Sequence, residues 1–298
     1  MTAIAAAPEI ALDTRVEPAA PPSVAATADR GFTRTFEQLG RGDIRSAGGK
    51  GANLGEMTRA GLPVPSGFVV TIAAYEAFSA ASGLRARLDK LGKDVRVENP
   101  SALHEAAEAL RKLVLAADIP DDVRRAIADA YRRLAVSDPI CAVAVRSSAT
   151  AEDTAEFSFA GMHESFLEVH GEEALVAKVR ECWASAYGAR AIFYRLKNGF
   201  PVEMGLAVVV QHMIASVKSG VIFTVDPASR DQTKVVMEAA WGLGEVVVGG
   251  QVTPDHYVLD KATLGVLDRV IARKEFLLEG APDIGGTRRV ELANDPRA

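Results

Sequence analysis

Hydrophobic positions follow a helical period in the first two thirds of the chain and a strand period afterwards. The predicted helices cover Ile72–Leu88, Ser101–Ala117, Asp121–Leu134 and Glu172–Asn198. The later predicted strands are Leu206–Val210, Gly220–Val225, Val235–Ala239, His256–Leu259 and Val266–Arg273. This change predicts a helix-rich first lobe over residues 32–200 and a strand-rich second lobe over residues 201–298. The boundary falls near Phe200-Pro201, and an Ala/Pro-rich extension precedes both lobes over residues 1–31.

Short signals refine the first lobe. The glycine-rich stretch GGKGANLG over 48–55 predicts a turn that leads into a helix, which the Gly61–Pro65 segment ends. Phe68–Thr71 then predicts a short strand. Ser101 and Asp121 are the expected caps of the two helices that follow them.

Composition limits the class of protein. The chain has 298 residues, 48% of them hydrophobic, and a net charge of −5, which argues against a general nucleic-acid surface. No apolar run is long enough to span a membrane, and the N-terminal extension lacks the basic start of a secretory signal. Its scattered acidic residues disfavour a transit peptide, so a flexible extension is expected. Two cysteines, Cys141 and Cys182, indicate a reducing, cytoplasmic setting. Both are expected to be buried structural thiols, and a functional thiol is the alternative.

The segment Ala142–Val169 carries the strongest chemical signal. A β-branched run at 143–145 predicts a buried strand with Arg146 at its end, followed by hydroxyl side chains, a loop containing Gly161, and a strand at 166–169 that Ser165 precedes. Arginine, hydroxyls and backbone N–H groups suit phosphate oxygens. The alternative is a surface hairpin with a solvated arginine. The acidic residues Glu152, Asp153 and Glu156 are expected to be a solvated face of the loop.

A second signal is the GGKG turn. Its glycines allow backbone N–H groups to approach an anion at a helix start, and Lys50 adds a positive charge. The spacing is not that of the GxxxxGK[ST] phosphate loop. A plain helix-start turn therefore explains the motif equally well.

Two further signals lie in the second lobe. Gln211-His212-Met213 follows an apolar strand, and such a segment can present hydrogen-bonding groups to an adenine edge. His212 and His163 are weak candidates for catalytic bases. Glu238 ends a strand before the Gly-rich stretch 242–250, where it could bind ribose hydroxyls or Mg²⁺. The alternative for this segment is a simple strand-to-turn junction.

These motifs in this order resemble one family. GGKGANLGEM, AVRSSATAEDTAEFSFAGMHESFLEV, VVVQHM and EAAWGLGEVVVGGQVTPDHYVL are similar to the N-terminal ATP-binding domain of phosphoenolpyruvate synthases. Rifampin phosphotransferases and pyruvate phosphate dikinases share that domain. The resemblance covers about residues 32–273 and implies an α+β, ATP-grasp-like fold with two lobes around the nucleotide.

The resemblance also implies a role for each matching residue. Lys50 and Arg146 would hold the ATP phosphates, and Gly161 and Ser165 would line the phosphate loop. Gln211 and Met213 would border the adenine, and Glu238 would lie beside the nucleotide. In this family the β-phosphoryl group of ATP passes to a histidine on a swivelling domain, in the same protein or a separate subunit, and then to an acceptor such as pyruvate.

Two family features do not occur in this sequence. One is the phosphohistidine motif; the other is the pair of D-I-E-W and Q-x-R-P type strands that supply the main Mg²⁺ ligands and a further phosphate-binding arginine. The sequence therefore predicts an incomplete second lobe, as in a fragment, a truncated product or one subunit of a split enzyme. Alternative readings are the ATP domain of a rifampin-type phosphotransferase, a non-catalytic nucleotide-binding module, or a pseudo-domain that holds a partner without nucleotide.

Overall fold

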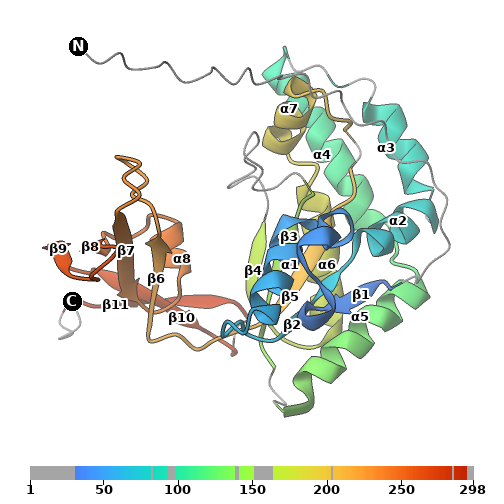
Figure 1. Cartoon of the computed structure of the whole chain (residues 1–298). Helices are drawn as coiled ribbons and strands as arrows, with labels where there is room; N and C mark the ends of the chain where they lie inside the picture. The colour runs from blue at the N-terminus through green and yellow to red at the C-terminus, as the bar shows by residue number, and fades with distance from the viewer. Residues whose placement is uncertain are drawn as a thin grey trace, which may run out of the picture. The chain divides into compact units, whose positions relative to one another are not determined.

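The computed structural model describes residues 31–293 except 82, 93–94, 96–97, 138–140, 151–163, 203 and 284. Figure 1 follows the chain through its helices and strands. Most helices lie before residue 200 and most strands after it, so helices and strands do not alternate strictly along the chain. This arrangement is that of the predicted α+β class. The predicted lobe boundary near residue 200 and the N-terminal extension stay predictions.

The first sheet has five antiparallel strands in the order β1-β2-β5-β3-β4. Its strands are β1 (Thr33–Thr35), β2 (Gly67–Val70), β5 (Ala207–His212), β3 (Val143–Ser148) and β4 (Ser165–Val169). The sequence pattern grouped β5 with the second lobe, but the structure places it at the centre of this sheet. Its valines at 208, 209 and 210 are fully buried because both faces of a central strand are covered.

Helices cover both faces of the first sheet. α1 (Ile44–Arg59) packs on the face that carries Val69, Ala207 and Val209. The main hydrophobic core lies on the other face, around Trp183. The helices that contribute to this core are α2 (Ile72–Ala81), α3 (Leu84–Gly92), α4 (Pro100–Ala116), α5 (Asp121–Leu134), α6 (Glu172–Ser185) and α7 (Ala189–Lys197).

Two predicted helices are each divided in the structure. The pattern over 172–198 becomes α6 and α7, because Tyr187 enters the core and bonds the hydroxyl of Tyr75 between them. The pattern over 72–88 becomes α2 and α3, separated at Gly83, whose φ is +60°. Hydrophobic periodicity continued across both breaks, so it did not reveal them.

The predicted caps also differ from the structure. α4 begins one residue early, at Pro100, and Asn99 is its cap: Asn99 Oδ1 accepts hydrogen bonds from the N–H groups of Ser101 and Ala102, both at 3.1 Å. Pro100 suits the first helical position because it has no N–H to satisfy. Asp121 is likewise the first residue of α5 rather than its cap.

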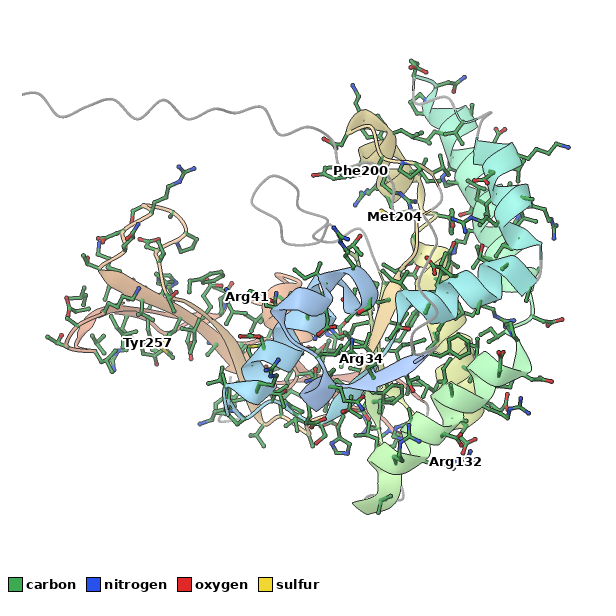
Figure 2. All side chains as sticks on the ribbon, turned by 45° about the vertical axis from the view of Figure 1, so that its right-hand side comes forward. Arg34, Arg41, Arg132, Phe200, Met204 and Tyr257 are labelled. Carbon is green, nitrogen blue, oxygen red and sulfur yellow. The ribbon has the colours of Figure 1, made fainter. Side chains whose placement is uncertain are left out.

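A second sheet of four antiparallel strands follows β5 along the chain, in the order β6-β7-β8-β9. Its strands are β6 (Lys218–Phe223), β7 (Lys234–Trp241), β8 (Asp255–Asp260) and β9 (Val266–Val270). The last ends three residues before its predicted end. Figure 2 labels Tyr257 on β8. The short helix α8 (Glu245–Val248) follows β7. The sequence did not predict the last two strands, β10 (Phe276–Gly280) and β11 (Thr287–Glu291), which form a hairpin. A bridge between Gly242 and Leu278 joins this hairpin to the segment that follows β7.

Both cysteines are buried, as predicted: Cys141 is 1% exposed and Cys182 is 0% exposed. Burial raises the pKa of the Cys182 thiol far above its usual range, which depletes the reactive thiolate. We expect neither thiol to react with Ellman's reagent at pH 8 in the folded protein, and both to react in urea. Rapid reaction of Cys182 without denaturant would contradict the buried, structural assignment.

No helix in the described part of the chain is both long and apolar enough to cross a membrane.

Candidate functional site

Strand pairing brings the two halves of the Ala142–Val169 segment together. β3 continues past the predicted end at residue 145, so Arg146 lies within the strand, opposite Ser165 on β4 and Val209 on β5. Side chains alternate along a strand, so Arg146 shares a face with Ala144 and Ser148. This is the face that α1 covers in part.

The GGKG turn lies against the end of β3. Gly48 has φ +69° and interrupts α1, and the helix resumes at Gly49. Ser148 Oγ accepts the N–H of Gly51 at 3.1 Å and donates to the carbonyl of Ala47 at 2.8 Å, while the N–H of Gly49 donates to Ala149 O at 2.9 Å. Two of the N–H groups expected to meet an anion are therefore used to join the turn to β3. Lys50 lies between them and is half-buried.

A pocket of about 420 Å³ opens on the same face of the sheet. Four predicted site residues line it: Arg146, Ser165, Gln211 and Met213. Its other lining residues are Pro65, Ala144, Leu167, His212, Ile214, Ser216, Leu243, Gly244, Glu245 and Val248. The structure thus brings together residues from β3, β4, β5 and α8 that lie up to 104 positions apart in the sequence.

The pocket has an apolar end and a polar end. Gln211 pairs with Ala144, and the adjacent Met213 and Ile214 supply apolar surface. Arg146 and Ser165 lie two residues further along β3, or about 6.6 Å at the usual rise of a strand. That separation suits a ligand with a flat, apolar group at one end and an anionic group at the other.

Hydrogen bonds within the protein use some of the polar groups at the apolar end of the pocket, which limits those that can bind a ligand. The Gln211 side-chain Nε2 donates to Pro65 O at 3.1 Å, and the N–H of Met213 donates to Ala142 O at 2.9 Å. These bonds use the Met213 N–H and one of the two Nε2 hydrogens of Gln211, so the second Nε2–H is the donor left for an adenine edge. The Gln211 Oε1 accepts no hydrogen bond from the part of the chain described, so it is the group available to a base amine.

Arg146 differs from Arg34 and Arg132, whose side chains are paired. Arg34 binds Asp43 at 2.6 Å and the carbonyl of Gln38, and Arg132 binds Asp129 and Glu172 (Figure 2 labels both arginines). Arg146 is half-buried, yet its guanidinium makes no hydrogen bond or ion pair with any residue that the structure describes. A partly desolvated charge without a partner is unfavourable, so this guanidinium is suited to receive an anion from the pocket.

The remaining predicted residues lie elsewhere. Gly161 falls outside the described residues, as do His163, Glu152, Asp153 and Glu156. Lys50 and Glu238 do not line the pocket. Glu238 lies within β7 opposite His256, whose Nδ1 is 3.6 Å from the Glu238 carboxylate. Its role beside a nucleotide stays a prediction.

Sequence reasoning missed the α8 side of the pocket. Leu243, Gly244, Glu245 and Val248 all belong to the Gly-rich stretch that was recognised, but the selected acid was Glu238. A signal was present: Glu238 lies three residues before the end of β7, whereas Glu245 comes after the two turn glycines, where the chain leaves the sheet. Acids that follow such a turn are better placed to face a ligand.

The fold and the pocket define an α+β domain whose site suits a ligand with an apolar and an anionic end. The family model for the pyruvate phosphate dikinase AMP/ATP-binding domain matches residues 44–298. The chain therefore belongs to this family, as its motifs predicted.

Curated relatives agree with this assignment. The chain is 44% identical over 267 residues to a probable phosphoenolpyruvate synthase of Methanocaldococcus jannaschii, covering 89% of this chain and 22% of the relative. It is 40% identical over 298 residues to the phosphoenolpyruvate synthase of Pyrococcus furiosus, covering 88% of this chain and 36% of the relative. The chain thus spans between about a fifth and about a third of the length of these relatives.

Proposed function

We propose that this chain is the ATP-binding part of a dikinase-type phosphotransferase with an ATP-grasp-like fold. In this proposal the β-phosphoryl group of ATP passes to a histidine of a swivelling domain and AMP is released. The γ-phosphoryl group passes to water, giving phosphate, or to inorganic phosphate, giving pyrophosphate. The phosphohistidine then transfers the group to pyruvate. The names of the relatives favour pyruvate over rifampin as the acceptor, because the two relatives described above are named phosphoenolpyruvate synthases.

The observation that carries this proposal is the guanidinium of Arg146, which has no partner among the described residues and lines the pocket together with Ser165. Arginine binds two phosphate oxygens at once through its planar fork of donors. Ser165, directly opposite, adds a hydroxyl donor. The apolar surface of Met213 and Ile214, with Gln211 Oε1, then accommodates the adenine.

Lys50 and Gly161 complete the proposed phosphate site. Lys50 lies in a turn that is bonded to the end of β3, two residues beyond Arg146. Movement of a flexible lysine side chain towards the phosphates would add a point charge to the arginine fork. Gly161 takes its role from the family motif alone.

Magnesium enters the proposal through the nucleotide. The residues described hold no group of three or more histidine, cysteine, aspartate or glutamate side chains suited to a metal. Glu245 is the one carboxylate that lines the pocket in this part of the chain. Mg²⁺ would neutralise charge on the ATP phosphates.

Nucleotide-dependent thermal stability tests the proposal. Ligand that binds only the native state stabilises it by RT ln(1 + [L]/Kd), or about 2.7 kcal/mol at a hundredfold excess over Kd. We expect ATP to raise the unfolding temperature of the 298-residue chain with rising concentration. Adding a relative's histidine domain and ATP labelled at the β-position should then label that histidine. An unfolding temperature unchanged by millimolar ATP would overturn the proposal.

A further inference from the structure

Glu245 is a carboxylate in the pocket for which the proposed phosphate and adenine contacts have no use. It is exposed, it lines the pocket, and its side chain makes no hydrogen bond or ion pair with the described residues. We infer that Glu245 binds the ribose hydroxyls of the nucleotide and makes the pocket selective for ribonucleotides. This inference rests on the proposed function.

The backbone that carries Glu245 is held firmly. Gly242 has φ +78°, and its N–H donates to Val217 O at 2.9 Å. Its carbonyl accepts the hydroxyl of Ser219 at 2.7 Å, and the N–H of Leu243 donates to Leu278 O at 2.8 Å. A group fixed before the ligand arrives loses little conformational freedom on binding.

Apolar packing then sets Glu245 over the first sheet. Leu243, Val246 and Val247 are buried in one cluster, against which Leu167 of β4 and Met213 after β5 pack. Glu245 adjoins these residues along α8, on the side that lines the pocket. The same contacts that stabilise the α8 turn therefore place the carboxylate above the floor of the site.

Neighbouring residues locate the carboxylate along the ligand. Glu245, Ser165 and Leu167 also line a second, adjoining pocket of about 410 Å³, whereas Gln211 and Met213 line the first alone. Ser165 pairs with Arg146, and Leu167 lies between Ser165 and Val169, which pairs with Val143. A nucleotide whose phosphates contact Arg146 and whose adenine contacts Gln211 has its ribose between these two residues.

The chemistry fits the ribose better than its neighbours. An ionised carboxylate only accepts hydrogen bonds, and its two oxygens match the two donors of a cis-diol. Next to bare phosphates it would be repelled, and an adenine edge needs donors as well as acceptors. The competing assignment makes Glu245 a Mg²⁺ ligand. In that case its contribution to ATP binding would depend on the metal, whereas a contact with the ribose would not.

A ligand and variant cycle tests the inference. ATP and 2′,3′-dideoxy-ATP are titrated by calorimetry into the wild-type chain and into Glu245→Gln, with and without Mg²⁺. We expect the wild type to prefer ATP by about tenfold or more, the range for hydrogen bonds to a charged group. Glu245→Gln should lose most of that preference by weakening ATP alone, whether or not Mg²⁺ is present. The matched control is Glu279→Gln, whose carboxylate pairs with Arg288 on the β10-β11 hairpin and should keep the preference.

Each other outcome is informative. Equal weakening of both nucleotides by Glu245→Gln, or no weakening, would overturn the ribose assignment while wild-type ATP binding upholds the proposed function. An effect that disappears in EDTA would make Glu245 a metal ligand and also overturn it. Failure of the wild type to bind either nucleotide would overturn the proposed function and the inference together.

Discussion

Replacement of Arg146 by methionine is expected to weaken ATP binding by one to two orders of magnitude while leaving the fold intact. The guanidinium has no partner in the described chain, so its removal breaks no contact there. In the complex it would make charged hydrogen bonds, each worth about 1.5–3 kcal/mol. Because an unpaired, partly desolvated charge is unfavourable, the variant without ligand should be as stable as the wild type or slightly more so.

The measurement is ATP binding by calorimetry together with thermal unfolding in the absence of nucleotide. Arg125→Met is the matched control, because Arg125 is exposed on α5, away from the pocket, and should leave ATP affinity unchanged. Arg146→Lys should give intermediate affinity, since lysine keeps the charge but loses the planar fork. Wild-type ATP affinity in Arg146→Met would contradict the phosphate role.

Replacement of Gly48 by alanine is expected to destabilise the protein by about 2–5 kcal/mol. Gly48 is buried at φ +69°, and a Cβ there would lie 2.2 Å from the carbonyl oxygen of Ser148. A left-handed conformation costs an L-residue about 1–2 kcal/mol, and overpacking adds about 1–3 kcal/mol. Backbone must move to relieve this contact, which would also displace Lys50 from the end of β3.

Urea denaturation followed by the fluorescence of the buried Trp183 measures this loss. Gly61→Ala separates the two contributions, because Gly61 has φ +76° but nothing lies within 4 Å of its Cβ position. That variant should lose only about 1–2 kcal/mol, the cost of the left-handed backbone. Equal losses in the two variants would show that the approach of the turn to Ser148 is not a tight contact.

The local sequence predicted those features that depend on neighbouring residues. The β-branched run at 143–145 predicted a buried strand, and the glycines of 48–51 predicted a break before a helix. Arg146, Ser165, Gln211 and Met213 were selected from separate motifs, and the structure groups them in one pocket. Arg146 and Ser165 belong to one short segment of the chain, so a sequence motif can contain both of them.

Other features depended on contacts between distant segments. Ser148 and Gly51 are 97 positions apart, and their hydrogen bond uses an N–H group that the isolated motif offers to a ligand. The helix pattern over 172–198 gave no sign that Tyr187 would leave the helix to meet Tyr75, 112 positions earlier. An apolar stripe predicts that one face of a helix is buried, but it does not predict which residues pack against that face.

The sequence by itself determined the family and the α+β class and supplied the candidate residues for an anion site, because motif spacing and side-chain chemistry are properties of the chain itself. The tertiary structure decided which strand completes the first sheet and which acid faces the pocket. β5 lies between β2 and β3, and Glu245 rather than Glu238 lines the site. Both outcomes follow from packing: the valines of β5 are buried from two sides, and the apolar residues of α8 pack with Leu167 and Met213, which places the neighbouring carboxylate in the pocket.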